Sequence, residues 1–257
     1  MEDSGNSKEK PTSDFPKVEF LLNEELDVIK LDKFLTHEKR RGGANFKEML
    51  PKTHPQLMGY EKLDPEDRLE KLKDYVHSYY QEHAQDLDNL VEKINKEWID
   101  YSPQFFKVAG KIFKDMVWPE GEYKGYLTIS PPYPRYLNTK TFQFSSDTTE
   151  RGIRIASHEL LHFIFYDYVR KRYLPDMTNT LEREMEEKLE GKFQIPLWEL
   201  SEIFNIVVLS GDEWGKATTK QSASGYPHLK DYVPKFNELW EASGKDIDKL
   251  FTKLEVN

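Results

Sequence analysis

The chain contains no cysteine, and this absence limits the chemistry available to it. With 0 Cys among 257 residues, disulfide bonds, thiolate metal ligands and a cysteine nucleophile are all excluded. Any metal ion must therefore be held by histidine, aspartate, glutamate or water. Histidine is also scarce, with 7 residues in the whole chain, so two histidines close together suggest a shared role.

Long apolar runs and basic clusters are missing as well. The longest apolar run, at residues 203–209, is far too short to span a bilayer. The N-terminal segment "MEDSGNSKEKPTSDFP" lacks the apolar core of a signal peptide. The formal net charge is −9 and no basic stripe is evident. We therefore expect a cytoplasmic protein that binds neither nucleic acid nor a membrane.

The composition changes along the chain and indicates three segments. Residues 1–15 are polar, and we expect a disordered tail there. Residues 16–118 predict a mainly helical region, with a short strand at 17–22, a helix within 31–43, a loop at 43–64 and a helical break near Ser102-Pro103. Residues 119–257 predict strands at 126–129 and 140–144, and then helices. The expected fold class is α+β and mainly helical, with a small sheet just before a helix at about 147–173.

That helix carries the stretch "SHELLHFIFYDYV" at 157–169, which contains the motif H-E-x-x-H. Histidines four residues apart lie one turn above each other on a helix, so His158 and His162 can reach one metal ion. Glu159 is rotated by about 100° from His158 and can reach a metal-bound water instead. This arrangement suits zinc-assisted hydrolysis, with Glu159 as the general base.

A zinc site of this kind needs a third protein ligand. The segment "IPLWELSEIFNIVVL" is the most apolar predicted helix after the motif, and it offers Glu199 and Glu202. An acid is costly to bury there unless it is paired or bound to metal. Glu202 lies one turn from Trp198 and one turn from Ile206, which favours it, whereas Glu199 near the helix start is explained by the helix dipole alone. Both remain candidates at this point.

Two other interpretations use the same residues. Glu159-x-x-His162 is also the pattern of di-iron helical bundles, but these need a second Glu-x-x-His pair, and the sequence has none. A metal-free helical scaffold would leave a buried imidazole pair in need of other hydrogen-bond partners. The apolar residues on both sides of the histidine face favour the metal site over both.

Three segments in this order, "SHELLHFIFYDY", "LWELSEIFN" and "GYPHL", resemble the gluzincin metallopeptidases, the thermolysin-like group, and more closely small uncharacterised bacterial putative peptidases of that superfamily. The resemblance covers roughly residues 120–245 and implies a zincin-like catalytic domain over residues 119–257. It implies one zinc ion per chain on His158, His162 and an acid aligned with Glu202, with Glu159 as the base. It also implies that the strand "KTFQF" is a sheet edge that pairs with an extended peptide or protein substrate.

The resemblance is incomplete in two respects: the Asn-Glu pair that commonly opens the glutamate helix is absent, and one position near the ligand glutamate differs. Many family members carry an aspartate one turn after the ligand glutamate, where this chain has Ile206, so we expect Asn205 to orient the first histidine instead. For the oxyanion of the transition state, "GYPHLKDYV" offers Tyr226 and His228. The sequence therefore predicts a zinc-dependent peptidase. The alternative is a catalytically inactive zincin fold that keeps the metal as part of a binding or regulatory module.

Overall fold

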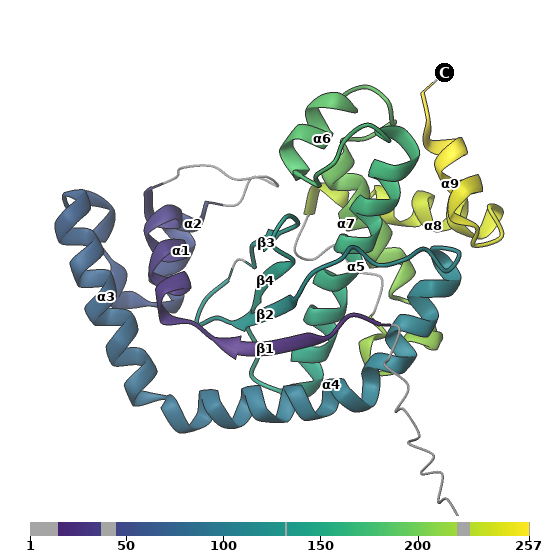
Figure 1. The fold of residues 1–257 in the computed structure, drawn as a ribbon. Helices are drawn as coiled ribbons and strands as arrows, with labels where there is room; N and C mark the ends of the chain where they lie inside the picture. Colours follow the sequence, from purple (N-terminus) through teal and green to yellow (C-terminus); the bar gives the residue numbers. More distant parts are fainter. Residues whose placement is uncertain (1–14, 37–44, 132, 220–226, 257) are drawn as a thin grey trace, which may run out of the picture.

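The computed structural model describes residues 15–36, 45–131, 133–219 and 227–256, and it is mainly helical with one small mixed sheet (Figure 1). Apart from Phe15, the tail predicted at 1–15 lies outside the described residues. In the part of the chain that is described, no helix is both long and apolar enough to cross a bilayer. The α-helices are α1 (Glu24–Thr36), α2 (Phe46–Thr53), α3 (Pro65–Glu82), α4 (Ala84–Ile112), α5 (Thr149–Tyr173), α6 (Glu182–Lys188), α7 (Leu197–Val208), α8 (Tyr232–Ala242) and α9 (Ile247–Leu254).

The sheet has four strands in the order β1-β2-β4-β3. The strands β1 (Val18–Leu22), β2 (Tyr123–Leu127) and β4 (Thr141–Phe144) are parallel, and the two-residue strand β3 (Arg135–Tyr136) is antiparallel to β4. The prediction that "KTFQF" is an edge strand is wrong, because β3 covers the outer side of β4, with Arg135 opposite Phe142. The strand β3 could not be predicted from the sequence, because it is only two residues long and follows a proline-rich stretch.

The free edge of the other outer strand, β1, is hydrogen-bonded by a side chain of helix α4. Asn95 of α4 accepts a hydrogen bond from the Phe20 amide at 3.0 Å and donates one to the Phe20 carbonyl at 2.8 Å. Its side-chain amide thus replaces a neighbouring strand at this point. The other sheet edge, β3, lies toward α5 and α7, since Arg135 of β3 contacts Tyr166 and Glu202 of these helices.

Most predicted helices are confirmed, and two local expectations in the N-terminal region are wrong. The expected loop at 43–64 contains α2 and two short 3-10 turns. The expected break at Ser102-Pro103 is absent, because α4 continues through Pro103. A proline in a helix interior costs about 3 kcal/mol, but Tyr101 and Phe105 on either side of it are buried, and their packing outweighs that cost.

The largest hydrophobic cluster surrounds α5 and takes in the inner faces of the sheet, α4, α7, α8 and α9. The predicted boundary between residues 118 and 119 runs through this cluster and through the sheet, since α4 and β1 precede it. Gly152 of α5 permits a close approach to α4, because a Cβ atom there would lie 2.7 Å from Ile94 Cδ1. Helix α5 is thus a central element packed on several sides, which gives its side chains a fixed setting.

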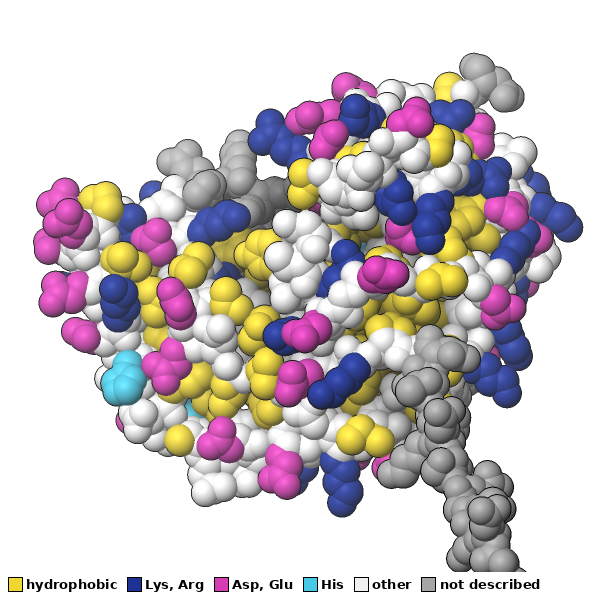
Figure 2. Space-filling view, in the orientation of Figure 1, with side chains coloured by type: hydrophobic (Ala, Val, Ile, Leu, Met, Phe, Trp, Pro, Cys, Tyr) yellow, Lys and Arg dark blue, Asp and Glu magenta, His cyan; other side chains and the backbone are white. Residues whose placement is uncertain are grey.

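A second cluster is formed by α1, α2, α3 and the turn after α2. Buried polar groups join it to the end of β2. Asp27 accepts from Tyr80 at 2.8 Å and pairs with Lys30, and Lys30 donates to Thr128. On the face shown in Figure 2, Asp and Glu side chains gather over α3, whereas Lys and Arg are more frequent over the C-terminal helices.

Candidate metal centre

The helix α5 begins at a capped end and carries the H-E-x-x-H motif near its middle. The Thr148 side chain is the N-cap and accepts a hydrogen bond from the Arg151 amide at 3.3 Å. His162 is fully buried, whereas 24 % of the His158 side chain is exposed. The motif therefore has one deeply enclosed histidine and one that borders solvent.

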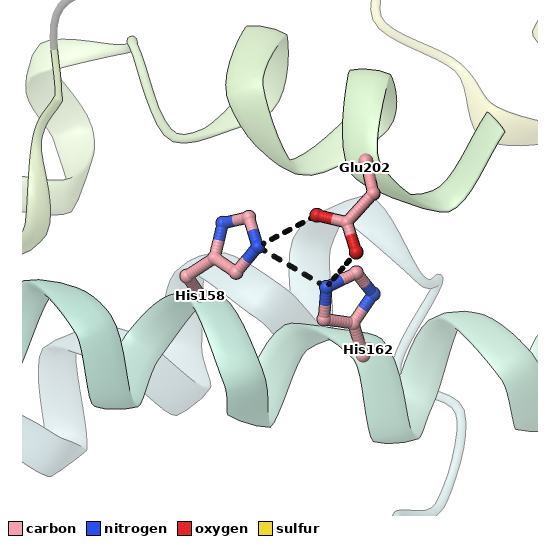
Figure 3. A group of neighbouring side chains, drawn as sticks. All are labelled: His158, His162 and Glu202. Carbon is pink, nitrogen blue, oxygen red and sulfur yellow. Dashed lines mark hydrogen bonds and ion pairs between the residues drawn. The ribbon is translucent and has the colours of Figure 1, made fainter. Parts of the chain in front are cut away.

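Both histidines face Glu202 of α7, which is also buried (Figure 3). His158 Nε2 lies 3.2 Å from His162 Nε2 and 3.1 Å from Glu202 Oε2. His162 Nε2 lies 3.5 Å from Glu202 Oε1. The three side chains form a group that could hold a metal ion, and within the described residues it is the only such group.

The two histidine nitrogens are spaced like neighbouring ligands of a tetrahedral zinc ion. With ligand bonds of about 2.1 Å, such an ion places its donor atoms about 3.4 Å apart, and the two Nε2 atoms are 3.2 Å apart. Glu202 places a different oxygen near each of them, Oε2 at 3.1 Å from His158 and Oε1 at 3.5 Å from His162. A pair of imidazole nitrogens facing each other and a carboxylate at this range is a donor set of the kind that zinc uses, with two nitrogens and one oxygen.

Arg135 of β3 joins this group, and nothing in the sequence pattern pointed to it. Its Nη1 lies 3.1 Å from Glu202 Oε1 and 3.8 Å from Glu159 Oε2, and its Nη2 lies 3.2 Å from Glu182 Oε2. The guanidinium also lies over the Tyr166 ring, 5.7 Å from its centroid. Burial disfavours its charge, but the carboxylates of Glu182 and Glu202 hold the pKa of this arginine above its ordinary value. The site thus contains a fixed positive charge.

Glu159 is buried but lies outside the three-residue group. Among the described residues, its Oε2 atom has no hydrogen-bond partner. Burial, opposed by the charges of His158 and Arg135, raises the pKa of the Glu159 carboxyl to about 7. A carboxyl group with this pKa can both accept and release a proton near neutral pH, which is the property required of a general base and acid.

The environment shifts the pKa values of the three grouped residues from their ordinary values in different directions. Burial lowers the pKa of His162 to about 3, with help from Arg135. Burial would also lower the pKa of His158, but the hydrogen bond and charge of Glu202 raise it above the ordinary value. Burial would raise the pKa of Glu202, yet His162 and Arg135 bring it well below the ordinary value. Glu202 is therefore ionised and His162 neutral, the forms that bind a metal, whereas His158 would release its proton on binding one.

The structure places the other predicted residues as follows. Glu199 does not join the histidines; its Oε1 lies 3.7 Å from His228 Nε2. His228 also stacks on Trp198, with ring centroids 6.4 Å apart. Its predicted role at the oxyanion stays a prediction, and Tyr226 lies outside the described residues.

Asn205 contacts the first histidine, but not as expected. Its Nδ2 atom donates to the main-chain carbonyl of His158 at 2.9 Å, and its Oδ1 atom has no hydrogen-bond partner among the described residues. The expectation that Asn205 accepts a hydrogen bond from the His158 ring is therefore wrong. From α7, the Asn205 side chain reaches the main chain of α5 and not the imidazole. Asn205 fixes the separation of α5 and α7 beside the metal-binding group.

No family model, no curated protein and no solved structure matches this chain. The site is therefore interpreted from its own residues and their geometry.

Proposed function

We propose that the protein is a zinc-dependent hydrolase, and most specifically a peptidase of the gluzincin type. The observation that carries this proposal is the convergence of His158, His162 and Glu202, whose ligand atoms lie within 4.8 Å of one another, with Glu159 of the same motif beside them. Helix α5 supplies the two histidines and the base, and α7 supplies the acid.

The local charge supports a divalent cation. The carboxylates of Glu159, Glu182 and Glu202 all lie within ion-pair distance of the Arg135 guanidinium. A divalent cation beside Glu202 adds positive charge near these carboxylates, which is electrostatically favourable in a largely buried site. The two histidines and one carboxylate favour zinc over magnesium or calcium, which prefer oxygen ligands.

The chemistry assigned to the residues follows from their positions. A zinc ion held by His158, His162 and Glu202 would lower the pKa of a bound water to about 7 and would polarise a carbonyl group. Glu159 accepts a proton from the attacking water and returns it to the leaving amine, a role that its raised pKa suits. Arg135 holds Oε1 of Glu202 by a charged contact. His228 remains the described candidate for stabilising the oxyanion.

The sheet offers one strand for an extended substrate. Since Asn95 closes β1 and β4 is an inner strand, the edge near the site is β3. An extended peptide that adds to β3 would run past Arg135, which touches both Glu159 and Glu202. This replaces the expectation that the substrate pairs with "KTFQF".

The test is peptide cleavage by the zinc-loaded protein and by Glu159→Gln, a variant that keeps the three proposed ligands. We expect cleavage that is lost on chelation, restored by zinc and reduced by at least about a hundredfold in Glu159→Gln, since general acid–base catalysis contributes 10²–10⁴-fold. Zinc binding without any cleavage dependent on Glu159 would contradict the proposal and support the alternative of an inactive module.

A further inference from the structure

A pocket of about 530 Å³ lies between the end of α6 and the first turn of α7, the helix that carries Glu202. This volume is within the range of small-ligand sites. The floor is apolar, since Leu189, Phe193 and Leu197 are buried side chains, and Trp198 forms part of the wall. The pocket can therefore hold an aliphatic chain.

The charged residues that line this pocket are all acidic. They are Glu186, Glu187, Glu190 and Glu199. No lysine or arginine is among the described lining residues. The neighbouring cation Lys192 is directed to Glu255, at 3.0 Å, and Arg183 pairs with Glu187 of the lining at 2.9 Å. Glu190, which is exposed, is the lining carboxylate on which the inference depends most. An apolar floor with carboxylates around it complements a side chain that has an aliphatic stem and a cationic end.

The pocket and the metal centre share helix α7, and residues of α6 connect the pocket to Arg135. On α7, Glu199 of the pocket is three residues before Glu202 of the metal centre. On α6, Glu186 of the pocket is four residues after Glu182, which contacts Arg135. A helical turn rises about 5.4 Å and an extended peptide about 3.3 Å per residue. One helical turn therefore corresponds to one or two residues of an extended peptide, and this is the spacing that we take between the pocket and a bond cleaved at the metal.

We infer that this pocket binds a lysine or arginine side chain of a peptide substrate, one or two residues from the cleaved bond. The inference rests on the proposed function for the position of the cleaved bond. The stem of the side chain lies along Leu189, Phe193 and Trp198, and its charged end meets the surrounding carboxylates. The stacking of His228 on Trp198 brings the candidate oxyanion residue to the wall of the same pocket.

The experiment measures binding separately from cleavage. Peptides that differ only by lysine or norleucine at one position are titrated into zinc-loaded Glu159→Gln, and affinity is read by fluorescence anisotropy. We expect the lysine peptide to bind about tenfold more tightly, the effect of one or two partly exposed charge pairs. Adding Glu190→Lys should remove that preference. Adding Glu184→Lys, a matched change on α6 outside the lining of this pocket, should leave it intact.

Equal binding of the two peptides, or a lysine preference that survives Glu190→Lys, would overturn the inference. Cleavage by the wild-type protein then locates the lysine relative to the broken bond by mass spectrometry, and a distance greater than two residues would also overturn it. A lysine preference without any cleavage would refute the proposed function and leave the pocket as a peptide-binding site. The two failures are therefore distinguishable.

Discussion

Replacement of Arg135 by methionine tests whether this cation stabilises the carboxylates around the proposed metal centre. The variant keeps the side-chain volume near the Tyr166 ring and removes the cation that contacts three carboxylates at 3.1 Å, 3.2 Å and 3.8 Å. Removing one partner of a buried ion pair typically costs 3–5 kcal/mol. We therefore expect the metal-free variant to lose about 4 kcal/mol of its free energy of unfolding, a large part of an ordinary domain's stability.

Zinc should restore part of that loss, because its two positive charges compensate the same carboxylates. The assay is urea denaturation of the wild type and the variant, each with a chelator and with excess zinc. Arg183→Met is the matched control: Arg183 is 87 % exposed, so its pair with Glu187 contributes little. A metal-free Arg135→Met variant that is as stable as this control, or that gains no more from zinc than the wild type, would refute the reasoning.

Two further predictions concern Asn205 and His54. Asn205→Ala removes a buried 2.9 Å hydrogen bond between α7 and α5, and we expect a loss of about 1–3 kcal/mol in urea denaturation; no loss would show that this bond does not hold the helices. His54 forms hydrogen bonds with Tyr75 at 2.5 Å and with the Ile129 carbonyl at 3.2 Å, and burial lowers its pKa below 6.5. Its contribution to the free energy of unfolding is therefore present above pH 6.5 and is lost as the pH falls. The stability difference between the wild type and His54→Gln, followed by denaturation from about pH 8 to about pH 5, should therefore shrink on acidification, and a constant or growing difference would contradict this.

The helical parts of the fold could be predicted because their signals are local. Helix α5 has a capping threonine at its start, and α7 is a continuous apolar helix that stood out in the sequence. Helix α4 was predicted with a break, because a proline signal is local whereas the burial of Tyr101 and Phe105 that outweighs it depends on tertiary packing. The two-residue strand β3 has no periodic signal at all, so the edge of the sheet was assigned to the wrong strand.

The same distinction applies to the candidate site. The sequence could predict His158, Glu159 and His162 as site residues, because a fixed spacing on one helix determines their geometry. Glu202 was separable from Glu199 only by its apolar neighbours, and the structure brings Glu202 to the histidines and Glu199 to His228. Arg135 carried no signal, since its contacts join a short strand to residues 24 or more positions away.

The most direct test of the central claim is the metal content of the purified protein, measured by mass spectrometry for the wild type, Glu202→Gln and Glu199→Gln. The two variants make the same chemical change three residues apart on α7. The account predicts about one zinc per chain in the wild type and in Glu199→Gln, and a clear loss in Glu202→Gln. A wild-type protein that takes up no zinc after its addition, or a Glu202→Gln variant that retains zinc as fully as Glu199→Gln, would contradict it.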